Sequence, residues 1–433
     1  MFDNMALNYV FIGFFSIAFV MAVFQYFYHG IDIFSLLVQR TFDDAGTAAE
    51  ICIGFIGVFT LWMGIMRIGE KGGAIKLIAK LVSPFFNKIF PEIPKGHPVF
   101  GDMIMNFSAN MLGLDNAATP MGIKAMKELQ KLNPNKERAS NSQIMFLVLN
   151  TSGLTLIPIS ILALRYKTLN KLAEGRGLEL LSGSTDVFVP ILVTTFFSSL
   201  VGIITVSIIQ KINLLKPVIL AYLGGLSILV SSIIYYFSSL APNEVKPQSS
   251  LFAGVILFTF IIGFIVLGVR KKINVYDAFI DGAKEGLLTA IKIIPYLVGI
   301  LVAIGLFRVC GAMDLLLDGI RLFVSVFTDK TEFVEALPTA IMKPLSGGGA
   351  RAAMLETMNT SGLKEVTGGL AETFPSFLSG VFQGSTETTF YVLAVYFGAV
   401  GIKDTRYALG AGLIADFAGI IAAIIIGYLF YAY

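Results

Sequence analysis

The chain has 433 residues, of which 55% are hydrophobic and only 14% are charged. Soluble domains carry roughly 25% charged residues, so this composition argues against a soluble protein and predicts a polytopic membrane protein. A net charge of +3 is too small to indicate a nucleic-acid partner, and two histidines argue against a histidine metal site or a Ser-His-Asp triad. We therefore expect no enzyme and no resident cofactor or metal.

Apolar runs of about twenty residues recur along the chain, and each is long enough to cross a hydrocarbon layer of ~30 Å as a helix. We predict an all-α polytopic membrane protein in which the first run is retained as a helix. About nine spanning segments are expected, at 8–29, 47–68, 142–164, 187–209, 216–238, 251–269, 286–307, 375–398 and 408–431.

The first half of the chain contains three stretches that are not ordinary spans. Residues 75–90 are amphipathic and basic, which is typical of a helix lying along a membrane interface. Residues 100–126 are predicted to form a re-entrant helical hairpin with a polar tip, and the stretch NTSGLTLIP at 150–158 should unwind near Gly153 and Pro158. Broken backbone at membrane depth survives only inside protein or beside a water-filled cavity.

Candidate substrate-binding residues follow from these breaks. A helix that starts in a cavity binds anions or carbonyl groups, and unwound carbonyls coordinate a ligand or Na⁺. The hairpin could instead be only a turn with a helix cap, and the third span only a proline kink. The candidates are Asn106, Ser108, Asn110, Asp115 and Asn116 in the hairpin, and Asn150, Thr151 and Ser152 in the broken span.

The second half has the same kinds of element, after a linking span near 216–238. A weaker amphipathic segment lies at 313–327, and a second hairpin is predicted at 336–358, with the tip PLSGGGAR. Its glycines allow a close approach of backbone N–H groups to a ligand, and Arg351 would pair with a carboxylate or phosphate. Alternatively, the glycines only allow tight packing and Arg351 extends to the surface. Ser346 and Arg351 are candidate ligand-binding residues.

The stretch QGSTETT precedes an apolar helix at residues 383–389. Its acid, Glu387, must face a cavity, pair with a base or be protonated, because an ionised carboxylate in hydrocarbon is costly. We expect it to carry H⁺ or to hold Na⁺. The structural alternative is an ion pair with Arg351 or Arg308. Gln383, Ser385 and Thr386 are further substrate-binding candidates, and Glu387, Asp115, Thr388 and Asp416 are ion-coupling candidates.

The two halves appear as a repeat in the sequence. TLWMGIMRIGE at 60–70 aligns with ILVAIGLFRVCG at 300–311, and NTSGLTLIP aligns with QGSTETTFY, which sets Ser152 on Ser385 and Glu387 on Leu154. The first spans of the halves are the first and sixth overall, so the halves should be inverted in the membrane. Inverted repeats with broken helices are typical of secondary transporters. We expect one repeat at 1–212, a linking segment at 213–250 and an inverted repeat at 251–433.

The distribution of Lys and Arg predicts the orientation. Basic residues are denser in the loops on the side reached after the second span, so the N-terminus should be cytoplasmic. The basic loop expected at 165–185 is the exception, because it falls on the outside.

Several long motifs resemble a known family. MGIKAMKELQKLN, NMLGLDNAATPMGIKAM and LNTSGLTLIPISILALR resemble the spore maturation protein A family, and FRVCGAMD, EALPTAIMKPLSGGGARAAM and FQGSTETTFYVLAVYFGAVGIKDTRYALGAGLIADFAG resemble spore maturation protein B. The resemblance implies a fusion of the two, within the nucleoside-recognition or Gate superfamily. It makes nucleosides one candidate solute.

The motifs together predict a secondary transporter of a small polar solute, coupled to H⁺ or Na⁺, in the bacterial cytoplasmic membrane. The solute would be a nucleoside or, as Arg351 suggests, an amino or carboxylic acid. The alternatives are a channel and a membrane scaffold that recognises a nucleoside without transporting it. The expected partners are the lipid bilayer and the solute, and homo-oligomers are left open.

Overall fold

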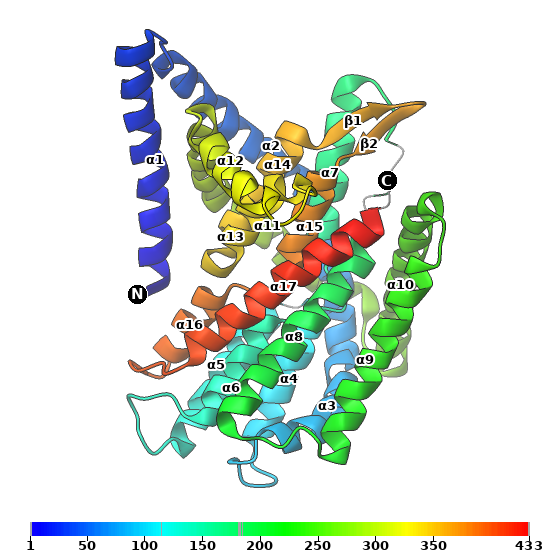
Figure 1. Cartoon of the computed structure of the whole chain (residues 1–433). Coiled ribbons are helices and arrows are strands. Elements are labelled where there is room, and N and C mark those ends of the chain that lie inside the picture. The colour runs from blue at the N-terminus through cyan, green and yellow to red at the C-terminus, as the bar shows by residue number, and fades with distance from the viewer. Residues whose placement is uncertain (1, 114, 181–182, 184, 432–433) are drawn as a thin grey trace.

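A computed structural model describes residues 2–113, 115–180, 183 and 185–431. Almost all of this chain is helical, as the all-α prediction requires (Figure 1). The first half contains α1 (Phe2–His29), α2 (Phe34–Gly72), α3 (Ala74–Ile89), α4 (Val99–Met111), α5 (Asp115–Leu132), α6 (Asn141–Ser152), α7 (Ile159–Arg176) and α8 (Phe188–Gln210).

The second half begins after α9 (Pro217–Ser238), which follows α8 in the chain. It contains α10 (Pro242–Arg270), α11 (Val275–Val309), α12 (Ala312–Ser325), a short 3₁₀ helix (Glu332–Ala336), α13 (Leu337–Leu345), α14 (Gly347–Ser361), α15 (Phe374–Ser385), α16 (Thr389–Gly398) and α17 (Ala408–Tyr431). Each half therefore has a long helix, an amphipathic helix, a helical hairpin, a broken span and a final span, in that order.

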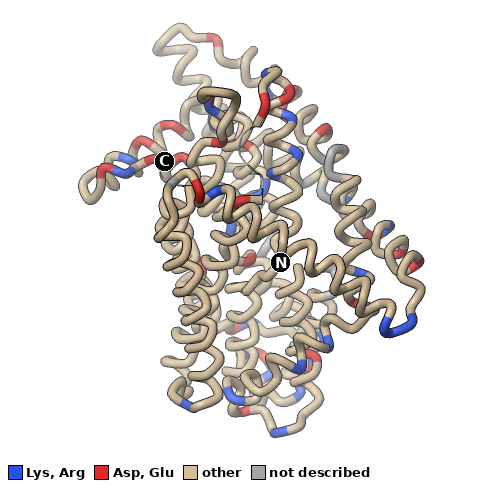
Figure 2. The backbone as a smooth tube through the Cα atoms, turned by 90° about the vertical axis from the view of Figure 1, so that its right-hand side faces the viewer, with Lys and Arg blue, Asp and Glu red and all other residues tan. Residues whose placement is uncertain are grey.

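Seven of the described helices are long and apolar enough to cross a membrane: α1, α2, α8, α9, α10, α11 and α17. They match seven of the nine expected spans. The other two expected spans are the broken ones, because α6 and α7, and likewise α15 and α16, are separate helices joined by short non-helical segments. Charged residues are sparse along the middle of the bundle, and Lys and Arg mark the loops at its lower end (Figure 2).

Equivalent elements of the two halves pack against each other in opposite directions. Gly64, late in α2, lies against the Phe279 ring early in α11, whereas Gly305, late in α11, lies against Asp44 early in α2. Similarly, Gln210 at the end of α8 donates to the Tyr407 hydroxyl before α17, at 2.9 Å. Antiparallel packing of equivalent helices is the arrangement that an inverted repeat produces.

Flanking helices follow the same correspondence, because α1 packs on α11 and α10 packs on α2. The helix α9 links the two halves in the sequence, and it has no equivalent among the described helices of either half. The division of the chain at residues 212 and 250 stays a prediction.

Two features differ from the expectation. A two-stranded antiparallel hairpin, β1 (Leu363–Val366) and β2 (Gly369–Glu372), projects from the helices (Figure 1). The expected loop at 165–185 is also wrong in its first part, because α7 continues to Arg176. Arg165 is therefore a helical residue and is fully buried.

Candidate functional site

The two predicted hairpins are both present and both end near the breaks in the spans. In the second hairpin, Ser346 caps α14, with its hydroxyl accepting from the Gly349 N–H at 3.0 Å. A Cβ added to Gly347 would lie 3.0 Å from Thr388 Oγ1, so the tip touches the second break. In the first hairpin, the Met111 carbonyl accepts from the Leu156 N–H in the first break at 2.8 Å.

The helices α6 and α15 end at equivalent serines, Ser152 and Ser385, as the alignment of the repeats predicts. After α6, Gly153 adopts the left-handed conformation, with φ of 42°, and the chain stays non-helical up to Pro158. Glycine reaches this conformation without the steric cost that a side chain imposes. Both breaks therefore occur at the end of a twelve-residue helix whose last residues are buried.

The two breaks contact each other directly. The Glu387 N–H donates to the Thr151 carbonyl at 2.8 Å. A Cβ added to Gly153 would lie 2.6 Å from Glu387 Cγ, so only glycine fits there beside the acid. The free carbonyl at the end of α6 thus finds its partner in the other half of the chain.

Side-chain amides, buried or half-buried, connect the first hairpin to both broken spans. Asn110 Nδ2 donates to Asn150 Oδ1 at 2.7 Å. The Tyr396 hydroxyl of α16 donates to the same oxygen at 3.3 Å and accepts from Asn106 Nδ2 at 3.1 Å. This network fixes the hairpin relative to α6 and α16, so the position of Asn110 depends on residues from both halves.

A cavity of about 280 Å³ lies where the tips and breaks meet. Its lining comes from both halves of the chain. The lining residues are Phe59, Trp62, Met63 and Met66 of α2, Asn110 and Gly113 at the first tip, Thr155, Ile157, Pro158, Ile159, Ser160 and Ile161 of the first break and α7, Thr289 of α11, Lys343 and Arg351 of the second hairpin, and Gln383, Gly384, Thr386 and Glu387 at the second break.

Five of the predicted site residues line this cavity: Asn110, Arg351, Gln383, Thr386 and Glu387. Others lie outside its lining, namely Asn106, Ser108, Asn150, Thr151, Ser152, Ser346, Ser385, Thr388 and Asp416. The side chains of Asp115 and Asn116 lie outside the described residues. Whether any of these side chains binds a ligand stays a prediction.

Sequence reasoning missed several residues of the lining. Lys343 and Thr289 were not singled out, and neither was Trp62, the only tryptophan in the chain. Lys343 stands three residues before Ser346 in a stretch already identified as a hairpin, so its charge was an available signal. Trp62 lies in an apolar span, where an aromatic residue alone indicates nothing about a ligand.

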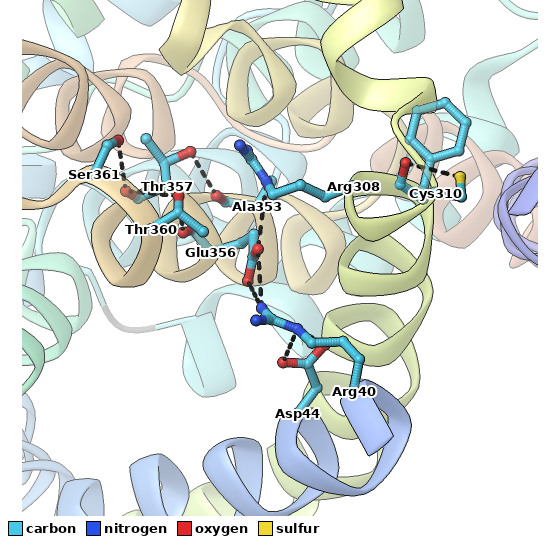
Figure 3. Close-up of polar contacts among 10 residues, drawn as sticks. Arg40, Asp44, Arg308, Cys310, Ala353, Glu356, Thr357, Thr360 and Ser361 are labelled. Atoms are coloured by element: carbon cyan, nitrogen blue, oxygen red, sulfur yellow. Dashed lines mark hydrogen bonds and ion pairs between the residues drawn. The ribbon is translucent and has the colours of Figure 1, made fainter. Parts of the chain in front are cut away.

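The alternative considered for Glu387, an ion pair with Arg308 or Arg351, is not present among the described residues. Arg308 lies 3.3 Å from Glu356, which also pairs with Arg40 of α2 at 3.2 Å. Figure 3 shows Glu356 between the two guanidinium groups, with Asp44 on the far side of Arg40. This network attaches the second hairpin to α2 and α11, and it leaves Glu387 facing the cavity.

A second ion-pair cluster is centred on Arg165. Its guanidinium donates to both carboxylate oxygens of Glu372, at 2.7 and 2.8 Å, and to Asp186 at 2.8 Å. All three side chains are at most 1% exposed. Burial raises the pKa of Asp186 to about 7. The cluster joins α7 to β2 and to the segment before α8.

Asp416 is more deeply buried than Glu387, at 2% exposed. Its Oδ2 accepts from the Thr389 hydroxyl at 2.6 Å, and its Oδ1 has no hydrogen-bond partner within the described chain. Among the described residues, no group of three or more His, Cys, Asp or Glu side chains could hold a metal ion.

Comparison with known proteins places the chain in a family. A family model described as Gate, nucleoside recognition, matches residues 52–167. Spore maturation protein A of Bacillus subtilis is 39% identical over 166 residues, which is 38% of this chain and 79% of that protein. Spore maturation protein B of the same organism is 44% identical over 166 residues, 38% of this chain and 87% of that protein. The chain belongs to the spore maturation protein A and B family.

No solved structure matches this spore maturation family protein. The Gate match covers the cavity residues from Phe59 to Ile161 and ends within α7. The cavity residues from Thr289 to Glu387 lie beyond it. The nucleoside-recognition description therefore applies to only one side of the cavity, and the names of the two relatives record no enzymatic activity.

Proposed function

We propose that this family member is a secondary transporter of a small polar solute, coupled to H⁺ or Na⁺, in the bacterial cytoplasmic membrane, with its N-terminus inside. The observation that carries the proposal is the cavity lined by hairpins and broken spans from both halves of the chain. Transporters with inverted repeats bind their substrates at this kind of interface.

Alternating access needs two bodies that can move against each other about a central site. The antiparallel pairs α2–α11 and α8–α17 provide surfaces for such a movement. Relative rotation would change which side of the Gly153–Glu387 contact is open to water. Glu387 and Asp416 are the acids positioned to link this movement to a cation, because one lines the cavity and the other lies behind it.

A second candidate is a membrane protein that recognises a nucleoside without moving it, which the description of the Gate family favours. The two are distinguished with purified protein in liposomes that carry an inward H⁺ or Na⁺ gradient. We expect a radiolabelled amino acid, carboxylic acid or nucleoside to accumulate only when the gradient is present. Saturable binding without accumulation would favour the recognition protein, and non-saturable flux without a gradient would favour a channel.

A further inference from the structure

The charges of the cavity identify the solute more closely, on the basis of the proposed function. Four ionisable side chains meet around the cavity: Lys343, Arg351, Glu387 and Asp416. Lys343 and Asp416 interact electrostatically with each other. Lys343, Arg351 and Glu387 all line the cavity. Neither Arg351 nor Glu387 makes an ion pair within the described residues, because Arg308 and Arg40 pair with Glu356 instead.

The environment of Arg351 suits a carboxylate. The guanidinium nitrogen Nε is shielded from solvent and has no hydrogen-bond partner in the part of the chain that the structure describes. The first turn of α7, from Pro158 to Ile161, lines the same cavity. Helix N-termini carry partial positive charge, and guanidinium groups bind carboxylates in a bidentate way.

The environment of Glu387 suits an ammonium group. Gln383, four residues before it in the chain, is 2% exposed, and its Oε1 accepts no hydrogen bond from any described residue. An ammonium group has three donors and no acceptor. A carboxylate and an amide oxygen that both line the cavity could accept two of these donors.

The third part of the lining is apolar. This apolar part is formed by four side chains of α2, namely Phe59, Trp62, Met63 and Met66. Such a surface favours an aliphatic or aromatic group over a further charge. A nucleoside carries neither a carboxylate nor an ammonium group, so it would leave two half-buried charges without counter-charges, which is costly.

We infer that the solute is a zwitterionic amino acid with an apolar side chain. Its carboxylate binds Arg351 at the start of α7, its ammonium group binds Glu387 and Gln383, and its side chain packs on Trp62 and its neighbours. The cavity of about 280 Å³ is close to the lower end of the size range of ligand pockets, which suits a small solute of this kind.

The test measures binding to the purified full-length protein by thermal shift and calorimetry. The probes are L-leucine, L-methionine and L-phenylalanine, with 4-methylpentanoate as the leucine analogue without an ammonium group and L-leucinamide as the one without a carboxylate. We expect at least one of the amino acids to bind, and its analogue lacking either group to bind at least about tenfold more weakly, because each loses a charge-assisted contact. For methionine or phenylalanine, the corresponding deaminated acid and amide replace the leucine analogues.

Two variants assign the contacts. Arg351→Gln should weaken amino-acid binding about tenfold or more and should abolish the preference for the amino acid over its amide. Glu387→Gln should abolish the preference over the deaminated acid. Arg138→Gln, which removes an exposed guanidinium outside the cavity lining, is the control and should change neither preference.

The inference is overturned if none of the three amino acids binds, if an analogue binds as tightly as its parent, or if adenosine binds in their place. The comparison of analogues on the unmodified protein decides the question even if a variant fails to fold. Accumulation of adenosine would overturn the inference and leave transport standing. Amino-acid binding without accumulation would contradict transport and leave the inference about the ligand standing.

Discussion

At the scale of single residues, the structure assigns different surroundings to the two acids near the second break. Glu387 is partly exposed to the cavity, whereas Asp416 is closed off behind Thr389. A carboxylate sealed from water is costly in its ionised form, so it favours the binding of a cation or a proton. We therefore propose that Glu387 binds the solute and that Asp416 binds the coupling ion.

Asp416→Asn tests this separation. We expect the variant to keep solute binding within about threefold, because Asp416 lies outside the cavity lining, and to lose accumulation driven by the ion gradient. The measurement is solute exchange against gradient-driven uptake in liposomes. Thr389→Val, which removes only the hydrogen bond to Oδ2, is the matched control and should retain part of the uptake. Full uptake by Asp416→Asn would contradict the assignment.

Arg165 is a residue whose removal should affect stability rather than transport chemistry. Arg165→Met leaves the carboxylates of Glu372 and Asp186 buried without their cation, at a cost of about 3–5 kcal/mol. A clear drop in melting temperature is expected in detergent. Arg138→Gln, which breaks an exposed pair with Asp404, should cost at most about 1 kcal/mol. Equal losses from the two variants would contradict this account of the cluster.

The pKa of Asp186 makes the stability depend on pH. Because burial raises this pKa to about 7, the folded protein binds a proton that the unfolded chain releases at lower pH. The contribution of Asp186 to stability is therefore greatest at acidic pH and is lost as the pH rises toward 7, with a slope of at most about 1.4 kcal/mol per pH unit. Melting temperatures at pH 5 and pH 8 measure this, and Asp186→Asn should reduce the slope.

At the scale of elements, the breaks between α6 and α7 and between α15 and α16 are the features on which the cavity depends. Gly153→Ala adds a Cβ in a left-handed conformation and within 2.6 Å of Glu387 Cγ. We expect it to destabilise the protein by about 1–3 kcal/mol and to impair transport. Gly57→Ala in α2, where a Cβ would meet nothing within 4 Å, is the control and should be neutral or slightly stabilising. A neutral Gly153→Ala would show that the breaks can separate.

The breaks could be predicted from sequence because their signals are local. Glycine, proline and clustered hydroxyls interrupt apolar runs, and the repeat gave the same interruption twice. The β1–β2 hairpin and the length of α7 could not be predicted in this way. Arg165 follows an apolar run, so the sequence predicted that the span ends there. Its buried partner Glu372 lies 207 residues further along the chain, where the sequence gives no sign of the pairing. Long-range pairing of this kind leaves no periodic trace in a single sequence.

At the scale of the whole molecule, the predicted orientation can be measured directly. Lys131, at the end of α5, is on the side predicted to be cytoplasmic, and its side chain is 70% exposed. Lys131→Cys, in a chain whose two native cysteines are replaced by alanine, should react with a membrane-impermeant thiol reagent only after the cells are permeabilised. Labelling in intact cells would show that the predicted orientation of the helices in the membrane is wrong.

The inversion of the two halves could be predicted from the repeat, but the individual residue contacts between the two breaks could not. Alignment set Ser152 on Ser385, and both serines do end their helices. That Glu387 contacts Gly153 across the interface depends on how the helices pack, which the alignment does not describe. This packing also decides which residues line the cavity, and it is the reason that Lys343 and Trp62 are among them.

The contact between Gly153 and Glu387 also bears on stoichiometry. Residues 213–250 separate the two sets of cavity residues, so a chain cut there would give two fragments, each holding an incomplete set of contacts. The uninterrupted polypeptide supplies the two sets in a one-to-one ratio, whatever the level of expression, and keeps them in the same membrane. Co-production of the two fragments from separate genes should restore solute binding only when both are made together.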